Sequence, residues 1–598
     1  MKYFVEKRIV LGAIIVGIGI IYLIRLFYLQ VIDTTYKYSA DSNVLRYETQ
    51  YPARGMVYDR NGKIIVYNEA AYDLMVIPRQ IKNLDTLDFC RTMKITKEDF
   101  VIKIKKIRQY STYKPSLFIK QISAKDYAVL QEKLFRYKGF FVQIRTLRSY
   151  PESSAAHILG YVGEVNDRMV EKNPYYKSGD YIGISGIEQS YEELLRGKKG
   201  VKISMVDVHN RIKGRFANGE FDTLPIAGKN IYLTIDAELQ KLGELLMDKK
   251  IGSVVAIEPS TGEILALVSA PSYDPSLLVG RVRSQNYTKL NRDSLKPLFN
   301  RALMAKYPPG SIFKIVESLI GLDYGVIHPG TGFACNKGIV NCHNHPTASN
   351  LTLAIQHSCN PYYYQVYNKI IQQGVSSNRF KDSEIGLARW AKSVKAFGLG
   401  QLLDIDLPGM KKGKIPDVEF YNKWYGAGRW AFSTIYSNGI GQGEVEIVPL
   451  QMANFTTVIA NKGYYVTPHL LKKIEDSDKI PFKLRQKHYV NIKKDYFDLV
   501  TNAMAQVVEA GTARRARIEG IQICGKTGTA ENPHGEDHSV FIAFAPMENP
   551  KIAIAVYVEN AGFGGTWAAP IASLMIEKYL TDSISRPELQ QYVIDFKH

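Results

Sequence analysis

The chain has 598 residues, of which 45% are hydrophobic and 23% are charged, a composition typical of a folded protein and not of a disordered one. The length exceeds that of one ordinary domain and predicts two or three. The formal net charge is +19, but lysine and arginine are spread along the chain, whereas a nucleic-acid-binding protein concentrates them in an arm or on one helix face. We therefore expect no nucleic acid partner. Attraction to anionic lipid headgroups or to an acidic polymer explains the surplus equally well.

The N-terminus carries a membrane-anchor pattern. Three basic residues within positions 1–8 precede an apolar run from Ile9 to Ile24, and the run with its flank reaches the roughly 20 residues that span a bilayer. A cleaved signal peptide is the alternative, but it would need a shorter apolar core and small residues at the cleavage site, and Leu26 to Val31 is bulky. We expect a cytoplasmic tail at 1–8 and a transmembrane helix at 9–29, with the rest of the chain outside.

Residues 30–229 show a mixed pattern without a cluster of catalytic side chains. Val57 to Val66 surrounds Asn61-Gly62, which predicts a hairpin. The stretch from Lys94 to Tyr137 is lysine-rich and amphipathic, and it includes a predicted helix from Asp126 to Phe135. A linker with glycine and proline ends near residue 229.

Residues 230–598 predict an α+β domain, in which one antiparallel sheet is covered by helices. The predicted elements are a strand at 230–236, a helix at 237–247, a hairpin at 252–269, strands at 541–546 and 552–558, and a final helix at 567–579.

The first chemical signal is Tyr307-Pro308-Pro309-Gly310-Ser311. The prolines and the glycine form a non-helical turn, and the apolar residues after Ser311 predict a helix, so Ser311 lies at or near its N-terminus. Unpaired N–H groups and the helix dipole favour negative charge there. Lys314 lies on the same helix face and can reach the Ser311 hydroxyl. A lysine kept neutral by desolvation would take its proton, but S-x-x-K by itself is more often a chance pattern.

Two later stretches complete a set of motifs. Ser358-Cys359-Asn360 has the form S-x-N, and Lys526-Thr527-Gly528-Thr529 has the form K-T-G. Each alone would more often be structural, as a helix cap, a turn residue or a strand end. In this order the three motifs are those of the penicillin-binding proteins and serine β-lactamases.

The flanking residues make the resemblance more specific. Four stretches around the motifs resemble class B penicillin-binding proteins, and most of all the elongation-type group called penicillin-binding protein 2. They are Tyr307 to Gly310, Gly439 to Glu444, Pro449 to Ala453 and Gly525 to Ala530. Two stretches upstream resemble signatures of that class's non-catalytic module. The first is Arg54-Gly55 with Asp59 to Gly62, and the second is Gly186 to Glu188 with Tyr191 and Leu195 to Gly197. The resemblance implies a pedestal or dimerisation-like module at 30–229, with an inserted head around 70–140, and a transpeptidase domain at 230–598.

The resemblance also implies what the protein does. It would be a peptidoglycan D,D-transpeptidase of cell-wall elongation in the inner membrane, with its catalytic domain in the periplasm. The implied catalytic residues are Ser311, Lys314, Ser358, Asn360 and Lys526, and the implied substrate-binding residues are Thr527, Gly528 and Thr529. No cofactor is needed for this chemistry. The implied partners are peptidoglycan stem peptides, β-lactam antibiotics, a membrane glycosyltransferase of the shape, elongation, division and sporulation family, and other elongation-complex proteins.

Other functions share these motifs. A class A β-lactamase has a Glu-x-x-x-Asn sequence for deacylation, and none occurs between Asn360 and Lys526, so the acyl-enzyme should pass to an amine, with at most weak carboxypeptidase activity. A septal class B enzyme is the closer alternative, although septal enzymes tend to carry an acidic residue before the proline-glycine. A non-catalytic β-lactam-binding sensor or scaffold is a third, against which the intact motif residues argue.

A separate group of residues suggests a metal. Cys335, Cys342 and Cys359 fall close together, and Cys342 is followed by His343-Asn344-His345. Three thiolates and one imidazole are what a closed tetrahedral zinc site needs, and we prefer His345 over His343 as the fourth ligand. The alternatives are a disulfide between Cys335 and Cys342, which an oxidising compartment would allow, or three core cysteines. A structural zinc ion is favoured because a disulfide leaves the histidines unexplained.

Overall fold

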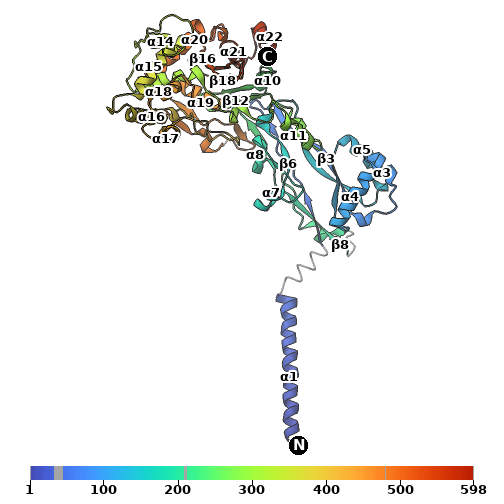
Figure 1. Ribbon diagram of the computed structural model, residues 1–598. Coiled ribbons are helices and arrows are strands. Elements are labelled where there is room, and N and C mark those ends of the chain that lie inside the picture. Colours follow the sequence, from blue (N-terminus) through green and yellow to red (C-terminus); the bar gives the residue numbers. More distant parts are fainter. Residues whose placement is uncertain (1, 33–44, 208–211, 478–479, 597–598) are drawn as a thin grey trace. The chain divides into compact units, whose positions relative to one another are not determined.

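The structure is a computed structural model that describes residues 2–32, 45–207, 212–477 and 480–596 (Figure 1). The chain forms two compact units. The first unit comprises residues 1–54, 70–146 and 196–228, and the second comprises residues 55–69, 147–195 and 229–598. The longest segment of the second unit begins at Lys229, the start of the second predicted domain, and the unit also takes in 55–69 and 147–195, which lie within the predicted pedestal.

The N-terminal helix of the first unit is α1 (Lys2–Phe27), extended by the π-helical turn η1 (Tyr28–Ile32). Within it, Ile9–Val31 is long and apolar enough to cross a membrane. Its described side chains are almost all exposed, as expected for a segment with no protein core to pack against.

The remainder of the first unit holds two sheets. The strands β1 (Leu45–Gln50), β8 (Gly200–Val206) and β9 (Ile212–Arg215) form one antiparallel sheet in this order. The far half of β3 (Ile64–Val76) pairs with β4 (Ser116–Ile122) and β5 (Phe140–Ser149). The helices on this second sheet are α3 (Thr86–Met93), α4 (Lys97–Tyr110) and α5 (Ala124–Lys133).

This inserted region has its own core. Phe89 is fully buried, and its ring contacts those of Phe100, Phe118, Tyr137 and Phe140 at centroid distances of 4.5–5.6 Å. Each of the three helices begins after a capping side chain, namely Asp85, Thr96 and Ser123. The region lies within the range 70–140, where the resemblance implies an inserted head.

In the second unit, the predicted hairpin is present as β2 (Val57–Tyr58) and the start of β3, with Val57 opposite Val66. The short strand β10 (Ile231–Leu233) lies parallel to β2 and antiparallel to β14 (Leu471–Ile474), so the strand expected near residue 230 joins this hairpin and not the catalytic sheet. The other small elements of residues 147–195 are α6 (Ala156–Leu159), β6 (Val162–Glu164), α7 (Asp167–Lys172), β7 (Tyr181–Gly183), α8 (Gly186–Ser190) and α9 (Glu192–Leu195).

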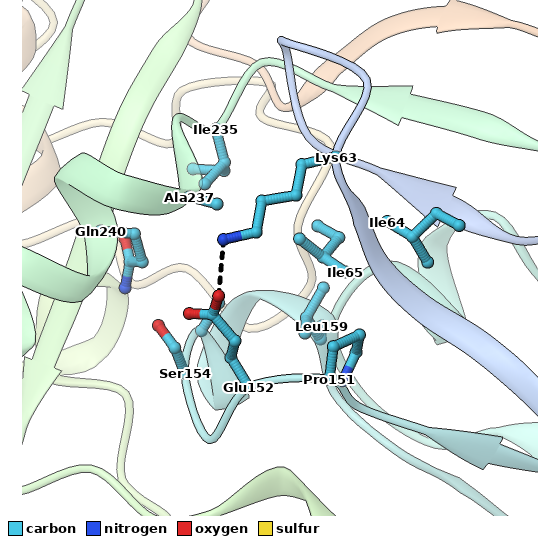
Figure 2. A pocket seen from close by; sticks show the side chains of 11 residues that line it. Lys63, Ile64, Ile65, Pro151, Glu152, Ser154, Leu159, Ile235, Ala237 and Gln240 are labelled. Atoms are coloured by element: carbon cyan, nitrogen blue, oxygen red, sulfur yellow. Dashed lines mark hydrogen bonds and ion pairs between the residues drawn. The ribbon is translucent and has the colours of Figure 1, made fainter.

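Charged side chains join these non-catalytic segments to the catalytic part of the same unit. Arg60 Nη2 lies 3.2 Å from Glu258 Oε2, and Arg60 Nη1 donates to the Tyr579 hydroxyl at 3.1 Å. Figure 2 shows a second link, in which Lys63 spans a small, mainly apolar pocket to reach Glu152 at 2.5 Å. Through Arg60 and Lys63, the hairpin around Asn61-Gly62 thus contacts later segments of the same unit.

The catalytic sheet is antiparallel with the strand order β12–β11–β18–β17–β16. Its strands are β11 (Gly252–Ile257), β12 (Ile264–Ala270), β16 (Cys524–Ala530), β17 (His538–Ala545) and β18 (Ile552–Val558). Because nearly every residue of these strands is buried, helices cover both faces. The predicted hairpin and the two later strands are confirmed.

Two groups of helices cover this sheet. The first group is α10 (Ala237–Leu246) and α21 (Ala568–Thr581), which contact the sheet and each other, with α22 (Pro587–Ile594) packed on both helices. The second is α19 (Pro449–Ala460) and α20 (Lys494–Ala510), which also contact the sheet and each other. The helix predicted at 567–579 is therefore not the final one. Lys250 Nζ donates to the carbonyl of Val593 at 2.7 Å and so ties α22 to the domain.

The remaining helices precede or surround the motifs. They are α11 (Arg283–Arg292), α12 (Arg301–Met304), α13 (Lys314–Asp323), α14 (Leu351–Gln356), α15 (Asn360–Ile371), α16 (Arg379–Ala396), α17 (Val418–Tyr425) and α18 (Phe432–Ile435).

Candidate active site

The nucleophile turn lies between two other parts of the second unit. Gly310 has φ +58°, and its N–H donates to the carbonyl of Gly441 at 2.8 Å. A Cβ on Gly310 would come within 2.5 Å of the Thr529 carbonyl. Only glycine meets both demands at this position, and the turn therefore places Ser311 directly beside the K-T-G strand.

Lys314 opens helix α13 after a 3-10 turn that contains Ser311. The lysine side chain is fully buried, and its Nζ donates to Asn360 Oδ1 at 2.6 Å and to the Ser358 carbonyl at 2.7 Å. The sequence predicts a contact with the Ser311 hydroxyl, but that hydroxyl has no hydrogen-bond partner among the described residues. In the described structure the lysine is held by the S-x-N motif instead.

Ser358 connects the two lysines of the site. Its Oγ lies 3.2 Å from Lys314 Nζ and 2.9 Å from Lys526 Nζ. Ser358 also has φ +55°, in the left-handed region that is unfavourable for a residue with a Cβ. A strained conformation of this kind is kept only where the surroundings impose it, and it turns the Ser358 side chain toward both amines.

The K-T-G motif lies on β16, the edge strand of the sheet. Side chains alternate along a strand, so Lys526 and Gly528 face the nucleophile turn. A Cβ on Gly528 would lie 3.0 Å from the Pro309 carbonyl. One side of the strand thus contacts the turn, while its free edge is available to an extended peptide.

Burial changes the acid–base behaviour of both lysines. It lowers the pKa of Lys314 to about 8, because a charged amine is poorly solvated in the interior. It also lowers the pKa of Lys526 well below the ordinary value, and the nearby charge of Lys314 adds to this effect. A minor fraction of Lys314 is therefore neutral near physiological pH and able to accept a proton.

One residue of the site has no counterpart among the predictions. The hydroxyl of Thr512 lies 2.5 Å from that of Thr527, and a Cβ on Gly565 would lie 2.6 Å from the Thr512 carbonyl. Thr512 follows α20, and only the packing of α20 on β16 brings it to the motif. Nothing in its local sequence marks it, since Gly511-Thr512-Ala513 reads as an ordinary helix end.

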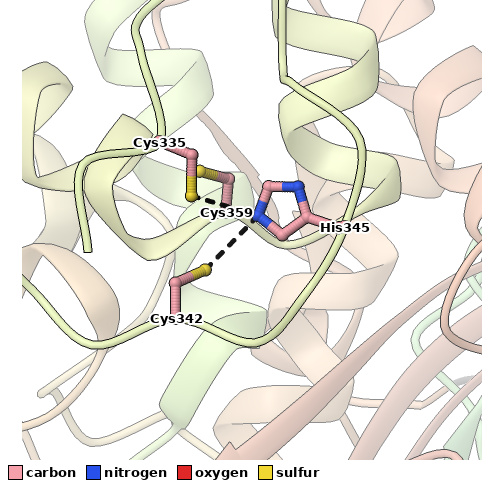
Figure 3. A group of neighbouring side chains, drawn as sticks. All are labelled: Cys335, Cys342, His345 and Cys359. Carbon is pink, nitrogen blue, oxygen red and sulfur yellow. Dashed lines mark hydrogen bonds between the residues drawn. The ribbon is translucent and has the colours of Figure 1, made fainter.

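Beside the S-x-N motif, the structure brings together the four residues chosen as metal ligands. Figure 3 shows Cys335, Cys342, His345 and Cys359 around a common centre, and their ligand atoms lie within 4.8 Å of one another. His343 is not part of this group. All five cysteines of the chain are free thiols, so the disulfide alternative is not seen.

The arrangement fits a tetrahedral ion. His345 Nε2 lies 3.4 Å from Cys342 Sγ and 3.5 Å from Cys335 Sγ; the edge of a zinc tetrahedron between nitrogen and sulfur is about 3.6 Å. The Nδ1 atom of His345 is 2.6 Å from the Pro346 carbonyl. That carbonyl holds the proton on Nδ1 and leaves Nε2 free to ligate.

The cysteine loop contacts the S-x-N motif directly. The N–H of Asn360 donates to Cys342 Sγ at 3.4 Å, and the Asn360 side-chain amide donates to the Asn341 carbonyl at 2.7 Å. The same asparagine accepts from Lys314. The loop therefore orients the residue that holds Lys314.

Comparisons with known proteins place this geometry in a family. Residues 49–233 match the penicillin-binding protein dimerisation domain, and residues 252–577 match the penicillin-binding protein transpeptidase domain. The peptidoglycan D,D-transpeptidase MrdA of Acinetobacter baumannii is 30% identical over 97% of this chain and 89% of that protein. The chain belongs to the penicillin-binding protein 2 group of the class B penicillin-binding proteins. MrdA of Escherichia coli (strain K12) is 31% identical over 90% of this chain and 88% of its own length.

Solved structures of the group share the fold. Penicillin-binding protein 2 of Helicobacter pylori, in complex with MreC, superposes with a TM-score of 0.75 at 25% identity, over 90% of this chain and 99% of that one. Penicillin-binding protein 2 of Pseudomonas aeruginosa, in complex with WCK 5153, gives a TM-score of 0.65 at 29% identity, over 90% and 97%. The predicted architecture of apolar helix, pedestal and α+β transpeptidase domain is confirmed.

Proposed function

We propose that this chain is a peptidoglycan D,D-transpeptidase that works through an acyl-enzyme on Ser311 during cell-wall elongation. The observation that carries the proposal is the convergence of two buried amines, Lys314 and Lys526, on Ser358 beside the nucleophile turn. A buried lysine with a lowered pKa is a base that needs no histidine. The names of the relatives support the same chemistry.

In the first half-reaction the donor stem peptide lies along the edge of β16. Ser311 Oγ attacks the carbonyl carbon of the penultimate D-alanine, and Lys314 takes the hydroxyl proton. The N–H groups of Ser311 and Thr529 stabilise the oxyanion. The C–N bond then breaks, and the proton passes by way of Ser358 to the departing D-alanine amine.

In the second half-reaction an amine of a neighbouring stem peptide attacks the Ser311 ester. A new amide forms, the C–O bond breaks, and the serine regains its proton. Water in place of the amine would give weak carboxypeptidase activity. The ring of a β-lactam opens by the first half-reaction, with Thr527 and Thr529 holding its carboxylate.

Covalent labelling tests the assignment. After incubation with benzylpenicillin, the intact mass of the protein should rise by one drug molecule, carried on the Ser311 peptide. Ser311→Ala should abolish the adduct, and Lys314→Ala should slow its formation by about 10²–10⁴-fold. Ser284→Ala, a substitution on an exposed helix, serves as the matched control. An adduct that persists in Ser311→Ala would remove Ser311 from the mechanism.

We propose the orientation and partners on the same basis. A basic N-terminus favours a cytoplasmic position for the first residues, and the catalytic domain would then lie in the periplasm. An alkaline phosphatase fused after His598 should be active, whereas an inactive fusion with a fluorescent cytoplasmic reporter would mean the reverse topology. Because a penicillin-binding protein 2 has been solved in complex with MreC, elongation-complex proteins and a membrane glycosyltransferase are the expected partners. Loss of rod shape on depletion, without a block in division, would separate elongation from septation.

We also propose that Cys335, Cys342, His345 and Cys359 hold a structural zinc ion. The ion would be a fixed cross-link of the loop that contacts Asn360, and the acylation chemistry itself needs none. The Cys359 thiol donates toward Cys342 and lowers the pKa of the Cys342 thiol, which favours the thiolate that a metal requires.

Metal analysis of protein purified without a histidine tag tests this site. One zinc per chain is expected in the parent protein and in His343→Asn, the matched control. His345→Asn and Cys342→Ser should lose most of the zinc and unfold at a lower temperature. Full zinc content in both of these variants, or a Cys335–Cys342 disulfide found by peptide mapping, would contradict the assignment.

A further inference from the structure

Helix α17 ends on aromatic side chains that the fold leaves outside. Trp424 is 70% exposed and Tyr425 is 47% exposed. Two of the other three tryptophans, Trp390 and Trp430, are fully buried. A large aromatic side chain held in solvent gains nothing for folding, and such groups are enriched where a protein binds something.

The exposed aromatic residue belongs to a row of side chains. Lys414 Nζ lies 4.8 Å from the centre of the Phe420 ring, and the Phe420 and Trp424 rings, one helical turn apart, have centroids 6.2 Å apart. We call Lys414, Phe420 and Trp424 the α17 ladder. Helix α17 contacts α16 in the second unit (Figure 1).

The surroundings of the α17 ladder are cationic. Residues 411–430 contain five basic and two acidic side chains, and four of the basic ones, Lys411, Lys412, Lys423 and Arg429, are exposed. Of the acidic ones, Asp417 caps α17 through the N–H of Phe420 and lies 3.7 Å from Lys395, while Glu419 is exposed. The surface thus offers an aromatic face within a positive field.

The α17 ladder is joined to the nucleophile turn through backbone pairing. Lys414 and Glu446 exchange two backbone hydrogen bonds, and the next residue, Ile447, exchanges two with Tyr307 at 2.8 and 3.0 Å. Tyr307 is four residues before Ser311. From the same helix, the Tyr421 hydroxyl donates to Glu444 at 2.7 Å, in the loop that contacts Gly310. Segment 444–447 therefore connects Lys414 and α17 to the turn that carries Ser311.

We propose that the α17 ladder binds the sugar backbone of a peptidoglycan strand whose stem peptide enters the active site. This inference rests on the proposed function. A pyranose ring presents an apolar C–H face that packs on an aromatic ring, and the carboxylates of stem peptides match the surrounding lysines. A protein partner would favour an aromatic anchor ringed by less polar contacts that exclude water, whereas the stretch that carries this ring also carries four exposed basic side chains.

Binding of soluble, uncross-linked glycan strands with intact stem peptides tests the proposal. The full chain in detergent would carry Ser311→Ala, so that binding is measured without covalent reaction. Trp424→Ala and Lys414→Ala should each raise the Kd for strands at least fivefold. Phe482→Ala, which removes another exposed aromatic side chain (76% exposed), should leave the Kd unchanged. The emission of Trp424 should shift to shorter wavelength on binding and resist acrylamide quenching.

Two further measurements separate the explanations. With Ser311 intact, Trp424→Ala should be acylated by benzylpenicillin at the parental rate, so a failure of acylation in the parent counts against the proposed function and not against the α17 ladder. An isolated stem pentapeptide should bind the parent and Trp424→Ala equally. Unchanged strand binding in Trp424→Ala would overturn the proposal. An equal loss of pentapeptide binding in Trp424→Ala would also overturn it. So would a Trp424→Ala variant that binds strands normally but no longer binds a protein partner.

Discussion

At the scale of single residues, the state of Lys314 sets the pH dependence of the reaction. Burial holds its pKa at about 8, so roughly one tenth of the amine is neutral at pH 7. Because the neutral amine is the base, the acylation rate should rise about tenfold per pH unit below pH 8 and level off above it. Stopped-flow acylation between pH 6 and 9.5 measures this profile, and a flat profile would exclude Lys314 as the rate-limiting base.

Thr512 gives a second prediction at this scale. Its hydroxyl is paired with that of Thr527, the residue expected to hold the substrate carboxylate. Thr512→Val keeps the shape but removes the hydrogen bond, which should lower the second-order acylation rate by about five- to tenfold. Thr512→Ser should restore most of the rate.

The control for Thr512 is chemical. The methyl ester of benzylpenicillin has no carboxylate to hold, so Thr512→Val should react with the ester at the parental rate. An equal loss with acid and ester would mean that Thr512 acts only on general packing.

At the scale of elements, the contact between the nucleophile turn and β16 depends on a glycine. In Gly310→Ala the new Cβ would meet the Thr529 carbonyl at 2.5 Å, so turn and strand must separate and penicillin labelling should be lost. Gly325→Ala is the matched control, because its φ is +68° but nothing lies within 4 Å. It should cost only the left-handed strain, about 1–2 kcal/mol, seen as a lower unfolding temperature with parental labelling. Equal labelling of both variants would show that the contact is not needed.

At the scale of the whole molecule, the second unit is assembled from segments far apart in the sequence. Arg148 Nε lies 2.7 Å from Glu188 Oε1, and both side chains are nearly inaccessible to solvent. Arg148 also donates to the Gly55 carbonyl at 2.7 Å. These contacts join three stretches of the non-catalytic sequence within one compact unit.

Removing one member of this pair should destabilise the second unit. Glu188→Ala leaves a buried guanidinium without its carboxylate, which typically costs about 3–5 kcal/mol. Thermal unfolding of the full chain in detergent should show the loss, with weaker penicillin labelling after mild heating. The double variant Arg148→Met/Glu188→Leu should recover part of the stability, since no charge remains buried. A double variant less stable than Glu188→Ala would mean that the ion pair is not the main contact there.

The sequence by itself determined the features that depend on neighbouring residues or on the order of motifs. The apolar N-terminal helix, the hairpin around Asn61-Gly62 and the strands of the catalytic sheet were all predictable, because periodicity and turn residues act over short distances. The motif residues Ser311, Ser358 and Lys526 were found because the resemblance supplied their order, and the cysteine and histidine spacing suggested the metal ligands.

Only the tertiary structure decided how these residues meet. It showed that Lys314 is held by Ser358 and Asn360, that Thr512 pairs with Thr527, and that segments 55–69 and 147–195 pack with the catalytic part. It also left Trp424 exposed while burying Trp430, six residues away. The physical reason is the same in each case: burial and hydrogen-bond partners are set by residues tens to hundreds of positions apart, which no local pattern encodes.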